Sequence, residues 1–152
     1  MAITNADARQ QLLDTLAEAT DELGSALALL GDAYERLDDH TADQLEEELF
    51  RPVQVAYGRA QRTYSEFAAR YDLPGRKFEQ AAPGAPHHDA RHLIDAATDA
   101  VAKADTILST LQDSMLPVEF GDPDLRAGLQ AVRELLGDLR VRARELVRRI
   151  GR

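Results

Sequence analysis

The chain has 152 residues, a formal net charge of −9 at pH 7 and no cysteine, which excludes disulfides, thiolate zinc sites and thiol catalysis. The excess of carboxylates argues against nucleic-acid binding, because contacts from lysine and arginine to phosphates supply most of that affinity. With no run of about 20 apolar residues to span a membrane and no secretion signal at the N-terminus, we expect a single cytoplasmic domain over residues 1–152.

The first predicted element is a long helix over residues 5–38. Its apolar stripe is formed by four leucines at heptad spacing, namely Leu16, Leu23, Leu30 and Leu37. Such a stripe must pack against other helices, because it cannot stay in water alone. Leu27 and Tyr34 lie in a second row that widens the stripe, which leaves room for a contact with a second chain.

The second predicted helix covers residues 42–72 and opens with a capping box at Thr41 and Gln44. Only a short turn separates it from the first helix, so the two must form an antiparallel hairpin. Pro52 lies inside this helix and predicts a kink or a break, since proline lacks the N–H that a helix needs. Aromatic side chains follow one another along the helix, namely Phe50, Tyr57, Tyr64, Phe67 and Tyr71.

This aromatic row is open to three interpretations. Aromatic residues at helical spacing are typical of the edge of a core. Tyrosine also suits interfaces, because its ring is apolar and its hydroxyl can stay wet. We expect the row to form an interaction surface together with Leu27 and Tyr34. A groove for a small apolar ligand against Tyr57, Tyr64 and Phe67 is the third interpretation.

The second half of the chain predicts two somewhat shorter helices. Residues 74–88 are rich in proline and glycine and form the one long irregular connection. Asp89 caps a helix over residues 89–115, and Asp122 caps a last helix over residues 123–150 whose heptads run without a break. The chain is therefore predicted to be all-α, an antiparallel up-down-up-down four-helix bundle with a long hairpin at its N-terminal half.

A cluster at the start of the third predicted helix is a candidate metal site. His88 and His92 are one helical turn apart, the spacing at which two imidazoles can share a divalent transition metal. Asp89 and Asp95 lie beside them and complete the candidate ligand set. His40 is expected at the opposite end of an up-down bundle, so only a crossover by the long proline-rich connection or an antiparallel dimer could bring it to them. The competing interpretation is an exposed polar stripe.

Arginines concentrate in the last predicted helix, Arg133, Arg140 and Arg149 among them. They can bind anions or pair with the acidic first helix, which carries Asp14 and Glu18. Because an up-down-up-down bundle places the first and last helices side by side, pairing is the expected role.

The sequence contains no nucleophile elbow, no glycine-rich phosphate loop and no zinc-protease motif. We therefore expect a non-enzymatic module for protein interaction or oligomerisation, which forms a homo-oligomer or binds a protein partner and needs no cofactor. A metal-binding and possibly hydrolytic bundle that uses His88 and His92 is the alternative, and binding of a small apolar ligand between helices is a further one.

Overall fold

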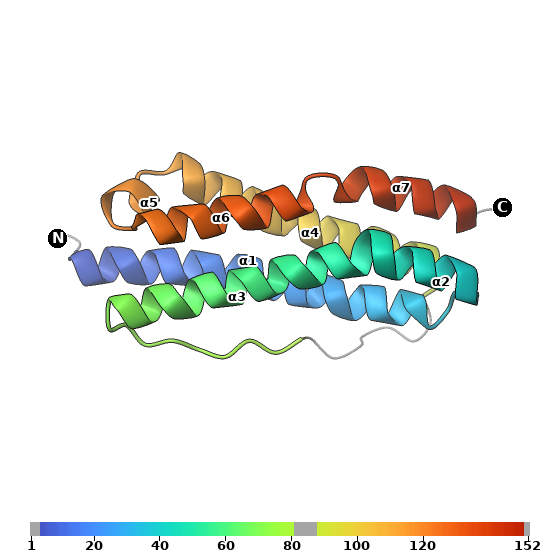
Figure 1. Cartoon of the computed structure of the whole chain (residues 1–152), viewed down its shortest axis with the longest axis horizontal. Helices are drawn as coiled ribbons and strands as arrows, with labels where there is room; N and C mark the ends of the chain where they lie inside the picture. The colour runs from blue at the N-terminus through green and yellow to red at the C-terminus, as the bar shows by residue number, and fades with distance from the viewer. Residues whose placement is uncertain (1–3, 81–87, 151–152) are drawn as a thin grey trace.

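The structure is a computed structural model that describes residues 4–80 and 88–150. Every regular element in these residues is a helix, which confirms the all-α prediction, and none of these helices is long and apolar enough to cross a membrane. In chain order the elements are α1 (Asn5–Tyr34), α2 (Asp39–Leu45), the π-helix η1 (Glu46–Phe50), α3 (Arg51–Arg70), α4 (Ala90–Asp113), α5 (Leu116–Glu119), α6 (Pro123–Leu136) and α7 (Leu139–Ile150). Figure 1 shows the longer helices aligned with the long axis of the molecule.

Short polar side chains start the helices where the sequence predicts caps. Asp89 accepts a backbone N–H at the start of α4, and Asp122 does the same for α6. The cap of α2 differs from the prediction, because Asp38 rather than Thr41 holds this place and accepts the Thr41 N–H at 2.8 Å. The turn therefore comes earlier in the chain, and α1 ends at Tyr34 instead of residue 38.

The irregularity predicted at Pro52 takes the form of a π-helical turn. η1 lies directly before Pro52, and the helix continues through it into α3 without a break. A π-turn inserts one residue into the helical register and so accommodates the missing N–H of the proline. Leu49 before the proline and Val53 after it are both buried, so the apolar face continues across this turn.

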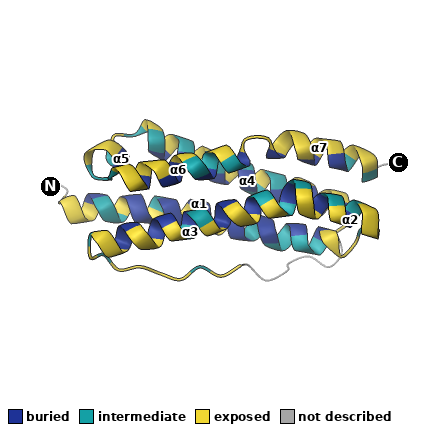
Figure 2. Cartoon of the chain, viewed as in Figure 1, coloured by how far each residue is buried: buried dark blue, intermediate teal, exposed yellow. Residues whose placement is uncertain are grey.

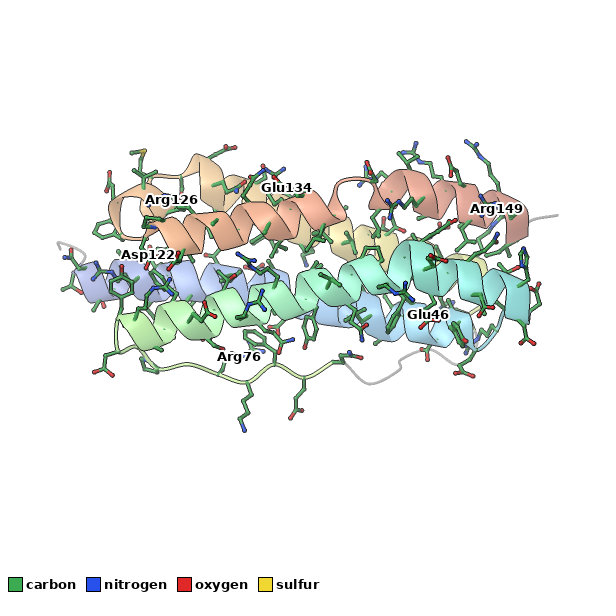
Figure 3. All side chains as sticks on the ribbon, in the orientation of Figure 1. Glu46, Arg76, Asp122, Arg126, Glu134 and Arg149 are labelled. Carbon is green, nitrogen blue, oxygen red and sulfur yellow. The ribbon has the colours of Figure 1, made fainter. Side chains whose placement is uncertain are left out.

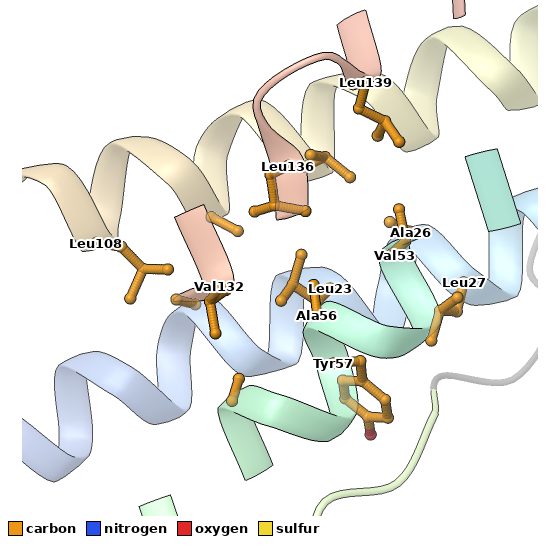
Figure 4. Packing of buried hydrophobic residues seen from close by; sticks show 14 of the residues in the cluster. Leu23, Ala26, Leu27, Val53, Ala56, Tyr57, Leu108, Val132, Leu136 and Leu139 are labelled. Atoms are coloured by element: carbon orange, nitrogen blue, oxygen red, sulfur yellow. The ribbon is translucent and has the colours of Figure 1, made fainter. Parts of the chain in front are cut away.

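The last predicted helix is divided into α6 and α7 at Gly137 and Asp138 (Figure 1). Both residues at the break are exposed, whereas Leu136 and Leu139 on either side are buried and face the core (Figure 4). Glycine is a poor helix former, so the helix is interrupted at this position. The apolar spacing continues across the break, which is why the heptad pattern predicted one continuous helix.

The order of helix directions differs from the predicted up-down-up-down. α3 and α4 both run towards the end of the molecule where α1 begins (Figure 1). The Lys103 ammonium of α4 pairs with the Glu22 carboxylate of α1 at 3.2 Å, and the Arg9 guanidinium donates to the carbonyl of Phe120, just after α5, at 3.0 Å. Both contacts agree with α4 running antiparallel to α1. The chain therefore crosses the length of the molecule between α3 and α4. A fully extended connection of this length can span about 60 Å, which is enough to cross the molecule. Its composition, rich in proline and glycine, is therefore compatible with either direction of α4.

The core lies between the helices, with α1 packed mainly on α4 and α3, and α3 packed on α6. Figure 2 shows that the buried residues of each long helix face inward, and Figure 4 shows Leu23 and Val53 among them. α3 and α6 approach each other closely at Gly128, where an added Cβ would lie 2.3 Å from the Thr63 hydroxyl oxygen. At this contact only glycine lets the two helices meet.

Candidate functional site

The aromatic row predicted as an interaction surface is mostly part of the core. Its buried members are Leu27, Tyr57, Tyr64 and Phe67, while Phe50 and Tyr71 are half-buried. Only Tyr34 is exposed, at 38 %. The row is therefore not an open surface in this structure, because the side chains that repeat along α3 face α1 and the remainder of the core.

A segment of the chain itself covers part of this row. Residues 72–80, here called the strap, run beside α1 and α3 without forming a helix (Figure 1). The Phe78 ring meets the Tyr64 ring edge to face, with 5.0 Å between the centroids. Arg76 binds the Asp21 carboxylate through hydrogen bonds of 2.6 and 3.0 Å (Figure 3). The strap thus occupies a place that the sequence predicted for a partner or an apolar ligand.

Tyr57 lies in the same row, and its side chain is almost fully enclosed by the surrounding protein. Its ring packs on Gly24, where an added Cβ would be 3.3 Å from the Tyr57 Cε1 atom. Its hydroxyl is buried and has no hydrogen-bond partner among the described residues. Burial raises the pKa of Tyr57, and the nearby Asp21 carboxylate raises it further. Both effects favour the neutral phenol over the phenolate.

Replacing Phe78 by alanine is expected to lower the free energy of unfolding by about 1–2 kcal/mol, because the edge-to-face contact with Tyr64 is lost. The matched control is Lys77→Ala, since the Lys77 side chain is exposed and its loss should change stability by less than about 0.5 kcal/mol. Urea denaturation followed by circular dichroism measures both. Equal stability of the two variants would show that the strap is not packed on the aromatic row.

The candidate metal ligands lie in water at the start of α4. Asp89 accepts the His92 backbone N–H at 2.8 Å, which lowers the pKa of the Asp89 carboxyl, and it contacts His92 Nδ1 at 3.3 Å. The rings of His88 and His92 stack with their centroids 5.6 Å apart. Asp95 is exposed and makes none of these contacts. Asp89 is thus engaged as the helix cap.

The expectation that His40 lies at the opposite end of the bundle from these histidines is wrong, and the structure has the crossover that was named as the exception. Because the chain crosses the molecule before α4, α2 and α4 begin towards the same end (Figure 1). Even so, in residues 4–80 and 88–150 no group of three or more histidine, aspartate or glutamate side chains is arranged to hold a metal ion. His88, His92, Asp89 and Asp95 are close in sequence but do not converge as ligands.

The arginines of α6 and α7 pair with other helices than the one predicted. Arg133 binds Asp105 of α4 at 2.9 Å, and Arg149 lies 3.7 Å from Glu48 of η1. Among the described residues, no ion pair joins α1 to α6 or α7. The crossing connection explains this, since it places α4 beside α1 and leaves the last two helices diagonally opposite.

A groove runs along the surface between α3 and the α6–α7 pair. Its central pocket has a volume of about 530 Å³ and is lined by Val55, Gly58, Arg59, Arg62, Ala131, Glu134 and Leu135. Two further pockets share residues with the central one and extend the groove to Arg70 and Asp124 at one end and to Arg51, Asp138 and Arg142 at the other. The helices touch at Gly128 and diverge towards Gly58, where an added Cβ would meet nothing within 4 Å.

The walls of this groove combine apolar and charged side chains. Val55 is 50 % exposed and is one of the few large apolar residues left in water. Arg51, Arg59 and Arg62 take part in none of the ion pairs between described residues. Sequence reasoning missed this site, although Gly58 inside an otherwise strong helix was a signal that no side chain is needed there.

The polar side chains that line the groove are mainly arginines and carboxylates. It is lined by no histidine, and the hydroxyl of Thr63 already donates to the Arg59 carbonyl at 2.8 Å. Its guanidinium groups can recognise carboxylates in a planar, bidentate geometry. Comparison with known proteins gave no match to a family model, to a curated protein or to a solved structure, so the function has to be inferred from this geometry.

Proposed function

We propose that the chain is an antiparallel four-helix bundle that acts as a non-catalytic protein-interaction module and binds a partner protein in the groove between α3 and the α6–α7 pair. The observation that carries the proposal is that apolar and cationic side chains of the groove are left without partners among the described residues. Val55 is exposed, and Arg51, Arg59 and Arg62 have no carboxylate partner among the described residues. Covering them with a partner would remove apolar surface from water and satisfy three cations.

The shape of the groove favours a protein over a small ligand. From Glu47 to Arg70 it follows α3 for about 35 Å at the helical rise, which matches the length of a helix and exceeds that of a metabolite. Arginine and apolar side chains together are typical of the residues that dominate binding energy at protein interfaces.

The charge of the groove favours a protein over a nucleic acid. Its lining contains as many carboxylates as arginines, namely Glu47, Glu66, Asp124, Glu134 and Asp138 against Arg51, Arg59, Arg62, Arg70 and Arg142. A phosphate backbone would be repelled by the first set as strongly as it is attracted by the second. A protein surface can present both signs of charge in matching places.

The proposal is tested by placing a photo-crosslinking amino acid at Val55 in the full chain, in the cells that naturally make it. The matched control places the same group at Ala96, an exposed position on α4 that does not line the groove. Irradiation is expected to join the Val55 variant to a defined protein, which mass spectrometry identifies, and to leave the Ala96 variant unlinked. Loss of this product in a Gly58→Trp background, where the indole fills the groove, would support the location.

The absence of any protein product specific to Val55 would contradict the proposal. So would a product that forms equally from Ala96, because it would report on random collisions. Far-UV circular dichroism of the Gly58→Trp variant provides the folding control, and its spectrum should match that of the unmodified chain since the added side chain extends into open space.

A further inference from the structure

We infer that the partner in the groove is a second copy of the same chain, related by a two-fold axis that runs parallel to the groove. The inference rests on the proposed function and names the occupant of the same site. It is carried by the charges of the two groove walls, which are complementary in the central pocket and in the pocket lined by Arg51 and Asp138.

The register of the two walls follows from the residues that meet across the groove. Thr63 lies opposite Gly128. Val55 shares the central pocket with Leu135 and Glu134. Further along, Glu47 and Arg51 of the α3 wall share a pocket with Asp138 and Arg142 of the α6–α7 wall. The two walls thus run antiparallel.

At these levels the two walls carry opposite charges. Because the walls run antiparallel, Arg51 lies towards the Asp138 side of their shared pocket and Glu47 towards the Arg142 side, while Arg59 lines the central pocket together with Glu134. None of these oppositions forms an ion pair within the chain, because the groove separates its own walls. Among these residues the only ion pair joins Asp138 to Arg142 of the same wall, at 4.0 Å, so no ion pair crosses the groove.

A two-fold axis along the groove brings the opposite charges of these two pockets together between two copies. Such an axis turns the second copy face to face with the first and carries its α3 wall onto the α6–α7 wall of the first copy at the same level. Arg51 then meets Asp138 of the partner subunit, Glu47 meets Arg142 of the partner subunit, and Val55 covers the partner subunit's Leu135. Each contact occurs twice, because the interface is isologous.

The net charge of the chain and the area of the groove both favour the groove as the contact between two copies. The chain as a whole carries a formal charge of −9, so two copies repel each other through most of their surfaces. The groove is balanced, with five arginines and five carboxylates, and is therefore a face through which two copies can approach. A contact about 35 Å long and two helices wide covers about 700 Å² on each copy, close to the roughly 800 Å² of a standard interface.

The test is sedimentation equilibrium of the full chain across the micromolar range. The wild type is expected to dimerise, and Arg51→Glu and Asp138→Arg are each expected to raise the dimer Kd by about 10-fold or more, because each places two like-charged pairs in the interface. The double variant Arg51→Glu/Asp138→Arg restores opposite charges and should return the Kd towards that of the wild type. Both residues are exposed and lie outside the core, so the variants should fold.

Arg148→Glu is the matched control, since Arg148 is exposed outside the groove and the variant has the same net charge as Arg51→Glu. It should dimerise like the wild type, within about twofold in Kd. A wild type that stays monomeric, single variants that dimerise like the control, or a double variant that is not rescued would each overturn the inference. If the chain is monomeric while Val55 still crosslinks to a different protein, the second-copy inference fails and the proposed function stands. If no protein is crosslinked at all, both fail.

Discussion

Replacing Gly128 by alanine is expected to lower the free energy of unfolding by about 2–3 kcal/mol, which chemical denaturation followed by circular dichroism measures. An added Cβ would lie 2.3, 2.5 and 2.9 Å from the hydroxyl oxygen, methyl carbon and Cβ of Thr63. Rotation of the Thr63 side chain gives little relief, because its Cβ is among the three clashing atoms and β-branched side chains are stiff at χ1. The variant must therefore push α3 and α6 apart and loosen the core between them.

Gly58→Ala on the facing helix is the matched control for this change. An added Cβ at Gly58 meets nothing within 4 Å, so the same substitution should raise stability by about 0.5–1 kcal/mol through helix propensity. The double variant Thr63→Ala/Gly128→Ala should recover part of the loss, since two of the three clashing atoms are removed. If Gly128→Ala were as stable as Gly58→Ala, the close contact of α3 with α6 would be wrong.

Removing the Asp122 side chain, as in Asp122→Ala, is expected to lower the free energy of unfolding at neutral pH by about 2–3 kcal/mol. The carboxylate caps α6 by accepting the Leu125 N–H at 2.8 Å. It also accepts two hydrogen bonds from Arg70, at 2.7 and 2.9 Å, and one from the Tyr71 hydroxyl at 3.1 Å. A single side chain thus joins the end of α3 to the start of α6. Thermal and urea unfolding measure the loss.

The contribution of Asp122 should depend on pH in a defined direction. Burial raises the pKa of its carboxyl, but the hydrogen bonds from Arg70, the Leu125 N–H and Tyr71 outweigh burial and hold this pKa below its ordinary value of 3.8. A depressed pKa in the folded state means that the stabilisation is fully present above pH 3.8 and is lost as the pH falls through the folded-state pKa. The stability difference between the wild type and Asp122→Ala should therefore shrink in acid.

Asp38→Ala is the control for the Asp122 variant, because Asp38 also caps a helix but takes part in none of the ion pairs found between described residues. At neutral pH, Asp38→Ala should lower the free energy of unfolding clearly less than Asp122→Ala does. Equal losses would mean that Asp122 acts only as a cap, and that its bonds to Arg70 and Tyr71 add nothing to stability.

Local features of the fold were predictable because their causes lie within a few residues of one another. Asp89 and Asp122 were recognised as caps because a short polar side chain reaches an N–H only three positions ahead. Pro52 predicted an irregularity in the helix, because proline lacks a backbone N–H. The break at Gly137 was not predicted, because the buried leucines on its two sides keep the apolar spacing of a continuous helix.

The candidate sites were predicted less well, because exposure depends on what else packs nearby. Tyr57 and Tyr64 have the spacing of either a core or a surface, and their burial follows from α1 on one side and the strap on the other. His88 and His92 have the spacing of metal ligands, yet a site needs a third group brought in from a distant part of the chain. Periodicity reports which side chains share a face and cannot report what covers that face.

The amino-acid pattern alone was therefore sufficient for the helical class, the caps and the apolar faces, since each arises from hydrogen bonds and side-chain spacing within a few turns of one helix. The direction of α4, the strap over Tyr64 and the groove beside Val55 were decided by tertiary packing. The physical reason is that each depends on a contact between residues far apart in the chain, such as Thr63 with Gly128. The free energy of such a contact does not exist until the helices have met.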